Sequence, residues 1–476
     1  MIIPKLPGVH LDTTLADLYR ENGIRGAFVV TMYCVFGHLD LHANFPRELT
    51  WPEDEEPVPF SDDPAEQDRL RKVILGLKPL RRAWGLGNME VLFFGPDITA
   101  KGMKTALSQL HPSQRHIPRL VDLDKGPVSE QLRGMTAKTA IGEAHGTENQ
   151  NKKLLFWRPQ GWMKEHDCLI DPQEAYDINS KKYLVTSGMR TPPSIIVDLQ
   201  TTDLSSASSS SLFHARPVPY VVKLCRAGCG FGTYLVRNEA ERASTMAALT
   251  AYQRRGVGEV LVSDYVDLAE DLAVHFLVGA PGTAHDREDP LILGVTTQTL
   301  TPGGKWVGGY IDYSAQARLG GLRAFDAAGH DAEAARVLRG LGGHRHRRRQ
   351  ARRRRRPAVR RGPQRALHRV HAHLLYGGPL LGASRAAAGP VRRVRVPGAH
   401  ADEIYERLYT LVQSGRVVVT ATATIDESQD GGDNDGSHMA DIVWGGQDQG
   451  DLARVEKEIR DQLGEKPRVQ LPEVAE

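Results

Sequence analysis

Sixty consecutive residues, 336–395, contain 19 arginines, no lysine and no acidic residue. Burying an unpaired charge costs several kcal/mol per ion, so a run such as Arg352–Arg356 cannot enter a hydrophobic core. A globular fold therefore has to leave most of this window outside its core. We expect the segment of about residues 336–398 to be disordered or misfolded in the chain as printed.

The window also conceals the charge of the rest of the chain. The full sequence of 476 residues has 61 Lys and Arg against 58 Asp and Glu, a formal net charge of +3. Without the 19 arginines of the window, 42 basic residues face 58 acidic ones, and the formal charge is −16. Most of the protein is therefore acidic, which disfavours nucleic acid as a partner.

Four interpretations of the arginine-rich window compete. It can be a solvated face or disordered tail, a surface that binds nucleic acid by releasing counterions, or a nuclear import signal. The fourth interpretation, which we favour, is translation in the wrong reading frame. An arginine codon CGN, read one nucleotide later, becomes GNN, which encodes Gly, Ala, Val, Asp or Glu.

A shifted frame turns part of the window into a strand with carboxylates. Over residues 358–366 the shifted codons are compatible with the sequence QFVVDLNVR. The strictest check of the shifted frame is at Gln364, where the shifted sequence needs Asn. With Arg365 written CGN, the shifted codon at this position can encode only Asn or Ser. The proper frame resumes before Ala401, where amphipathic patterning returns. Sequencing the transcript across codons 330–402 tests this interpretation, and an open frame that matches the printed residues would end it.

Chain length and cysteine content narrow the class of protein. A chain of 476 residues is long enough for two or three domains. Four cysteines exclude a disulfide scaffold and suit a reducing compartment. The apolar stretch 26–39 is too short and too polar to span a membrane, and no charged segment typical of a secretory signal leads into it. We expect a cytoplasmic protein without a membrane partner.

Hydrophobic patterning predicts α/β structure in the first third of the chain. Residues 89–95 are typical of a short buried strand, and residues 100–110 follow with helical spacing. Further on, residues 172–187 predict a helix with Asp171 as its N-cap, followed by a strand at 194–197. This succession favours an α/β domain with a largely buried sheet.

The remaining elements are predicted from the same patterns. A serine-rich stretch at 201–211 is typical of a loop. We expect helices at 239–254, 401–415 and 452–463 and an acidic loop around 427–436. Strands are expected at 220–224, 259–264, 272–278, 291–300, 306–312 and 416–423, and one more strand should follow the glycines after 224 and end at residue 236.

A glycine-rich hairpin follows the strand at 220–224. Backbone N–H groups of glycines can approach phosphate oxygens closely, and a strand lysine adds a point charge toward the same phosphates. Lys223 with Gly228, Gly230, Gly232 and Thr233 has that composition. The pattern is neither a Walker loop nor a Rossmann fingerprint, because the glycines lead into another strand. Taken alone, the pattern is weak and favours an ordinary turn, because glycine turns are common and a lysine on a strand is usually just exposed.

A second cluster of polar residues lies about forty positions downstream. The apolar strand at 260–262 runs into Asp264, Tyr265 and Val266, whose backbone could hydrogen-bond an adenine edge. Asp271 lies seven positions beyond Asp264 and could bind ribose hydroxyls. Upstream, Lys181 precedes a turn of glycine and prolines and offers a second phosphate lysine.

These motifs, in this order, resemble the ATP-grasp superfamily of ADP-forming carboxylate ligases. In that family a lysine before a G-x-P-x-P-like turn comes first, a strand lysine with a glycine-rich flap second, and an adenine hinge with a ribose carboxylate third. Lys181, Lys223 and Asp271 match those positions, whereas Asp264 departs from the commoner glutamate. The resemblance covers about residues 165–425 and is closest to fungal ATP-grasp domain proteins, which suggests fungal secondary metabolism.

The resemblance implies a fold of α/β (α+β) class with the following organisation. A pre-ATP-grasp-like α/β domain occupies residues 1–165, and a two-lobed ATP-grasp domain occupies 166–425, with its flap lobe at about 190–262. An acidic loop and a C-terminal helix complete the chain at 426–476. Residues 336–398 are out of frame in this interpretation.

The resemblance also implies an ATP-binding, Mg²⁺-dependent ligase that joins a small-molecule carboxylate to an amine through an acyl phosphate. Lys181 and Lys223 would be the catalytic lysines that neutralise the α- and β-phosphates. The flap would cover the triphosphate, Asp264, Tyr265 and Val266 would hold adenine, and Asp271 would hold ribose. The expected magnesium strand falls in the arginine window, so no metal ligand can be named, and we expect the chain as printed to be crippled as a ligase. The flap residues are Gly228, Gly230, Phe231, Gly232 and Thr233.

Two other functions stay open. The chain can be a nucleotide-binding scaffold without catalysis, or a defective remnant of a ligase. It can also be a basic protein that binds nucleic acid through the arginine run 345–369. The first would bind ATP without releasing ADP. The second would bind in a salt-sensitive way that disappears when residues 340–396 are deleted.

Overall fold

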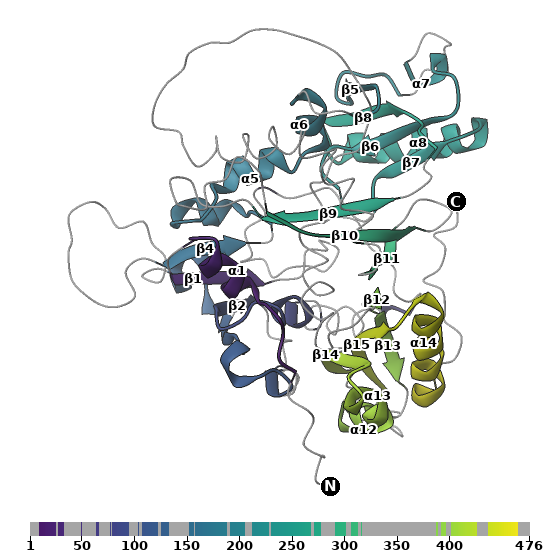
Figure 1. Cartoon of the computed structure of the whole chain (residues 1–476). Coiled ribbons are helices and arrows are strands. Elements are labelled where there is room, and N and C mark those ends of the chain that lie inside the picture. The colour runs from purple at the N-terminus through teal and green to yellow at the C-terminus, as the bar shows by residue number, and fades with distance from the viewer. Residues whose placement is uncertain are drawn as a thin grey trace, which may run out of the picture.

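The computed structural model describes a little over half of the chain. The described residues are 9–24, 27–32, 49, 63–65, 77, 79–94, 103, 107–121, 125–132, 152–156, 158–187, 191–204, 212–227, 230–267, 271–277, 291–300, 306–312, 316, 387–388, 392–396, 401–425 and 437–464. They form three sheets with flanking helices (Figure 1). This mixture confirms the predicted α/β class.

The first sheet is parallel and belongs to the N-terminal third of the chain. Its order is β3-β2-β1-β4, and the two central strands β1 and β2 alternate their apolar side chains between two covered faces, whereas most of the edge strand β3 is exposed. Val30, Val91 and Phe93 pack in one core cluster, and Val29 and Leu92 pack in another. The predicted strand at 89–95 is therefore confirmed. The strands are β1 (Ala27–Met32), β2 (Glu90–Phe94), β3 (Ile117–Val121) and β4 (Lys152–Phe156).

The helices around this sheet are short. α1 (Leu15–Glu21) begins at a capping box between Thr14 and Asp17, a signal in the sequence that we had not used. Within the predicted helix at 100–110 the structure describes residues 103 and 107–110; residues 103, 107 and 108 are helical, whereas Gln109 lies in a turn and Leu110 forms a bridge with Val9. The others are α4 (Val128–Leu132) and the 3₁₀ turns η2 (Pro112–Gln114) and η4 (Gly161–Glu165).

The second sheet, which we call the flap sheet, is antiparallel with the order β5-β8-β6-β7. One helix, α8 (Glu239–Arg254), covers one of its faces, and both the helix and β8 have the predicted bounds. A four-residue helix, α7 (Leu212–Ala215), precedes β6 and was not predicted. The strands are β5 (Ser194–Asp198), β6 (Tyr220–Leu224), β7 (Thr233–Val236) and β8 (Glu259–Asp264).

A helix pair leads into the flap sheet. The single helix predicted at 172–187 is in fact α5 (Pro172–Ile178) followed by α6 (Lys181–Thr186). Asp171 caps α5 as predicted, accepting hydrogen bonds from the backbone N–H groups of Gln173 and Glu174. The break occurs because the buried Ser180 acts as a second N-cap, and its hydroxyl accepts from the backbone N–H of Lys182 at 3.1 Å.

The third sheet, which we call the large sheet, has seven strands in the order β13-β15-β12-β11-β10-β9, and β14 also pairs with β15. The helices α12 (Ala401–Arg407), α13 (Tyr409–Gln413) and α14 (Gln449–Leu463) pack on it around a core that includes Trp444. The strands are β9 (Leu272–Leu277), β10 (Leu291–Leu300), β11 (Trp306–Asp312), β12 (Ala387–Ala388), β13 (Arg392–Val396), β14 (Val417–Ile425) and β15 (Ser437–Gly446).

Two expectations about the C-terminal part need correction. Residues 336–398 are not disordered throughout, because β12 and β13 lie within this range and pair with β15. Backbone hydrogen bonds do not depend on the side chain, and Val396 at the end of β13 is fully buried, so this arginine-rich segment can still form a strand. The remainder of the window, including the run 345–369, lies outside the described residues.

The second correction concerns residues 426–476, for which we expected only an acidic loop and a helix. The strand β15 lies in this segment and pairs with β12, β13 and β14. The final helix is confirmed as α14, three residues longer at its start than predicted. The acidic loop at 427–436 lies outside the described residues.

The two ends of the chain pack together. Leu11, Trp84 and Leu110 from the N-terminal third form a core cluster with Val418 of β14 and Val443 of β15. Among the helices that the structure describes, none has the length and apolarity that crossing a membrane requires.

Candidate functional site

Lys223 lies on the face of the flap sheet that is turned away from α8. Its neighbours Val222 and Leu224 on β6 pack in the core cluster that contains α8 residues. Because successive strand side chains point to opposite faces, Lys223 lies on the other face, in register with Thr233 of β7 and Leu261 of β8. The lysine is half-buried there.

This second face mixes polar and apolar groups. The register places Ser194, Val221, Ser263 and Glu259 on it together with Lys223. The hydroxyl groups of Ser194 and Ser263 lie 3.0 Å apart and form a hydrogen bond, while Val221 is buried. Such a surface is suited to a ligand that has both an apolar ring and charged groups.

The glycine-rich turn, residues 225–232, connects β6 to β7. Gly230 and Gly232 both adopt left-handed backbone conformations, with φ of 88° and 57°. A Cβ atom at Gly232 would lie within 2.4 Å of the Leu224 side chain, so glycine is required here by the turn itself. Phe231 packs against the core of the flap sheet. Gly228 lies outside the described residues.

Lys181 contacts the glycine-rich turn rather than standing apart from it. Its Nζ donates hydrogen bonds to the backbone carbonyls of Leu224 and Ala227, at 2.9 Å each. Its backbone N–H donates to the carbonyl of Cys225 at 2.8 Å. The structure thus brings Lys181 to the end of the strand that carries Lys223, and the predicted phosphate contacts of the two lysines stay a prediction. The side-chain contacts with backbone carbonyls were not predicted.

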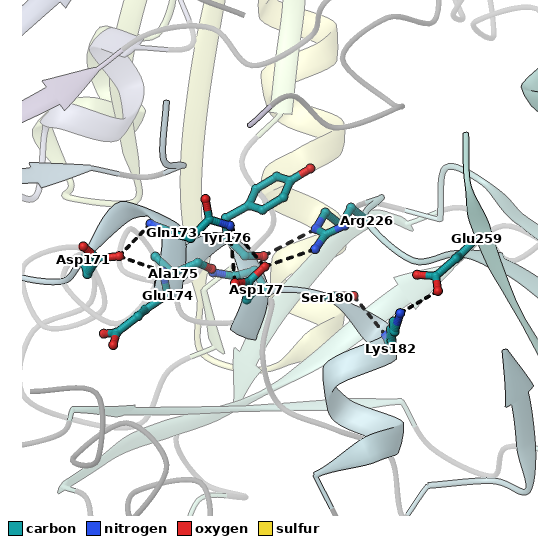
Figure 2. Close-up of polar contacts among 11 residues, drawn as sticks. Asp171, Gln173, Glu174, Ala175, Tyr176, Asp177, Ser180, Lys182, Arg226 and Glu259 are labelled. Carbon is teal, nitrogen blue, oxygen red and sulfur yellow. Dashed lines mark hydrogen bonds and ion pairs between the residues drawn. The ribbon is translucent and has the colours of Figure 1, made fainter. Parts of the chain in front are cut away.

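Two further charged residues lie near the start of the glycine-rich turn. Lys182 Nζ forms an ion pair with Glu259 Oε1 at 2.5 Å, and Arg226 forms one with Asp177 at 3.4 Å (Figure 2). Burial, with the nearby Glu259 carboxylate, raises the pKa of the Cys225 thiol, which therefore stays protonated at neutral pH. Sequence reasoning missed the ion pairs of Lys182 and Arg226, because their partners lie 77 and 49 positions away in the chain.

Asp264, Tyr265 and Val266 lie at the end of β8. Asp264 is exposed, and its carboxylate forms an ion pair with Arg216. The Asp264 backbone N–H donates to the carbonyl of Pro193 at 3.0 Å. Tyr265 is 38% exposed, so an aromatic ring stands in solvent where the chain leaves the flap sheet.

Asp271 lies at the entry to the large sheet. It precedes β9, and its backbone carbonyl accepts a hydrogen bond from Gln298 N–H of β10 at 2.8 Å. Lys223 and Asp271 therefore belong to two different sheets, joined by the segment 265–271. The predicted ribose contact of Asp271 stays a prediction.

The described part of the chain contains no group of three His, Cys, Asp or Glu side chains that could hold a metal ion. The arginine window supplies no carboxylate either. Neither the described residues nor the arginine window therefore supplies a named ligand for the magnesium that the resemblance implies.

Comparison with known proteins gives structural matches only. No protein-family model and no curated protein matches the chain. A structure of N5-carboxyaminoimidazole synthetase from Staphylococcus aureus with ADP matches at a TM-score of 0.34 and 9% identity, covering 65% of this chain and 80% of that one. N5-carboxyaminoimidazole synthase from Aspergillus clavatus, with ADP and aminoimidazole ribonucleotide, matches at 0.33 and 10%, covering 73% and 91%.

A third structure, D-alanine–D-alanine ligase from Bacillus anthracis with ATP, matches at a TM-score of 0.22 and 16% identity, covering 36% of this chain and 48% of that one. TM-scores of this size transfer neither an activity nor a substrate. The function has to be inferred from the residues of the chain itself.

Proposed function

We propose that the chain binds ATP between the flap sheet and the start of the large sheet, as an ATP-grasp ligase of the ADP-forming kind. The observation that carries the proposal is the position of Lys223. It lies at the root of a glycine-rich turn, on the sheet face opposite α8, and is only half-buried there. The neighbouring strand β8 runs into the segment 265–271 and then into β9. A nucleotide whose phosphates lie at Lys223 could therefore extend along this segment, with its ribose near Asp271.

In this proposal each residue has a defined task. Lys223 neutralises negative charge on the phosphates, and the glycine-rich turn closes over them and excludes water. The backbone at Asp264–Val266 holds the adenine edge, and Asp271 accepts hydrogen bonds from ribose hydroxyls. ATP then phosphorylates a small-molecule carboxylate, and an amine displaces phosphate from the acyl phosphate.

Isothermal titration of the full chain with ATP tests the proposal. Lys223→Met removes the charge but retains a long side chain, and we expect it to weaken ATP binding at least about a hundredfold, since charge-assisted contacts to phosphate dominate such sites. Lys153→Met, on β4 of the N-terminal sheet, is the matched control and should bind like the wild type. Equal ATP affinity for the Lys223 variant and the wild type would refute the assignment.

A second function, ATP binding without catalysis, is favoured by one observation. The arginine window, where the resemblance places the metal-binding strand, contains no carboxylate that could hold the metal of a phosphoryl transfer. ADP release in the presence of a panel of carboxylates and amines separates the two functions. Turnover supports the ligase, whereas ATP binding without any ADP supports a scaffold or a defective remnant.

A further inference from the structure

We propose that Arg226 and Lys181 are positioning residues that tie the first limb of the glycine-rich turn, residues 224–227, to the helix pair α5–α6. This inference rests on the proposed nucleotide site. It differs from the sequence-based role of Lys181, because the contacts of that lysine are with the protein backbone.

The first tie is made by Lys181. At the end of β6 the chain leaves the sheet, and the carbonyls of Leu224 and Ala227 converge on one ammonium group, at 2.9 Å each. A charged donor shared by two carbonyls three residues apart holds the backbone between them in a curve. The backbone N–H of Lys181 adds a third hydrogen bond, to Cys225. Residues 224–227, the first limb of the turn, are thus bound to the start of α6.

The second tie is made by Arg226, which lies within the same limb. Its guanidinium carbon lies 4.0 Å from the centre of the Tyr176 ring, and its Nη2 pairs with Asp177 at 3.4 Å. Its Nε also donates to the carbonyl of Tyr176 at 3.5 Å. Figure 2 shows Arg226 reaching toward both residues at the end of α5. A stacked and paired guanidinium has one preferred orientation, which a lysine cannot reproduce.

The two ties act on one side of the turn only. On the other side, Leu224 N–H donates to the carbonyl of Gly232 at 2.7 Å, which closes the hairpin. Residues 224–227 are thus held by the two ties, and Gly232 is held by the hairpin bond. This arrangement would place the phosphate-facing part of the turn reproducibly, and losing it should weaken ATP binding without unfolding the sheet.

Hydrogen exchange of the full chain, without nucleotide, tests the ties directly. We expect Arg226→Ala to speed amide exchange in peptides covering residues 225–232 at least about fivefold, with a melting temperature close to that of the wild type. Arg226→Lys retains the charge but not the stacking and should give an intermediate rate. Arg255→Ala is the matched control, because it removes a guanidinium stacked 5.7 Å from the Tyr252 ring at the far end of α8.

ATP titration of the same variants tests the consequence. Arg226→Ala should weaken ATP binding about tenfold, and Arg255→Ala should not. Unchanged exchange in the turn of the Arg226 variant would overturn the inference, as would unchanged ATP affinity in a wild type that binds ATP. If exchange rises but the wild type binds no ATP, the ties are supported and the proposed nucleotide site is the part that fails.

Discussion

Gly232 shows how much a single residue decides in the glycine-rich turn. Its backbone is left-handed, and an added Cβ would overlap Leu224. We expect Gly232→Ala to lower the free energy of unfolding by about 1–2 kcal/mol for the conformation and by about 1–3 kcal/mol more for the overlap.

Gly256 isolates the conformational part of this cost. It is also left-handed, with φ of 82°, but a Cβ there would meet no atom within 4 Å. Gly256→Ala should therefore lose only about 1–2 kcal/mol. Urea denaturation of the two variants measures the difference, and equal losses would mean that Leu224 can move aside.

The sequence predicted the hairpin that carries Lys223 and the glycines, but not the contacts that surround it. Lys223 and the glycines share a hairpin because both lie within one strand–turn–strand pattern. The bonds of Lys181 to Leu224 and Ala227 join residues 43 and 46 positions apart, and no local pattern encodes such contacts. The ion pair of Asp264 with Arg216 was missed for the same reason.

Helix α14 offers a test of how a single element is attached. Asp451 in its first turn is buried, pairs with Arg416 beside β14, and accepts from Gln447 N–H at 2.8 Å. Burial by itself would raise the pKa of the Asp451 carboxyl, but these hydrogen bonds and the arginine charge outweigh it and lower the pKa below 3.8. The ionised form is thus favoured by folding.

The pH dependence follows from that direction. A depressed carboxyl pKa adds stability that is present above the unfolded pKa of 3.8 and is lost as the pH falls through the lower folded pKa. Asp451→Asn should lower the free energy of unfolding by about 1–3 kcal/mol at pH 7 and by less below pH 3.8. Asp461→Asn, which removes an exposed pair with Lys457, should change it by less than about 0.5 kcal/mol. The measurement is urea denaturation of the wild type and Asp451→Asn from pH 7 to below pH 3.8. A difference in their free energies of unfolding that stays constant over this pH range would contradict the account.

Elements with strong local signals were predictable, and elements that depend on distant partners were not. α8, β8, β10 and β11 have the predicted bounds because their capping and apolar spacing are local. β15 was missed although residues 440–444 are buried, because an acidic loop and a helix flank it. The short β12 and β13 gain their structure from pairing with β15.

At the scale of the whole molecule, the first 110 residues are joined to the C-terminal strands. Gln109 is buried, and its Nε2 donates to Tyr405 Oη at 2.9 Å and to the carbonyl of Val419 at 2.8 Å. These partners lie 296 and 310 positions away, which is why sequence patterns gave no sign of this contact.

Removing this side chain should weaken both ends of the chain together. Gln109→Ala leaves a buried carbonyl without that donor, and we expect a loss of about 1–3 kcal/mol in the free energy of unfolding. Gln200→Ala also removes an amide that bonds two carbonyls, but in an exposed position where water can replace it. Calorimetry should show a lower melting temperature for the first variant only. Equal melting temperatures would show that the two ends are not coupled through Gln109.

The central claim is that one nucleotide contacts both the glycine-rich turn and the segment that leads from β8 to β9. Hydrogen exchange of the full chain with and without ATP measures this directly. We predict that ATP slows exchange in peptides covering residues 223–233 and in peptides covering 264–272, with the same dependence on ATP concentration. Protection of only one of these segments, or of neither at saturating ATP, would contradict the account.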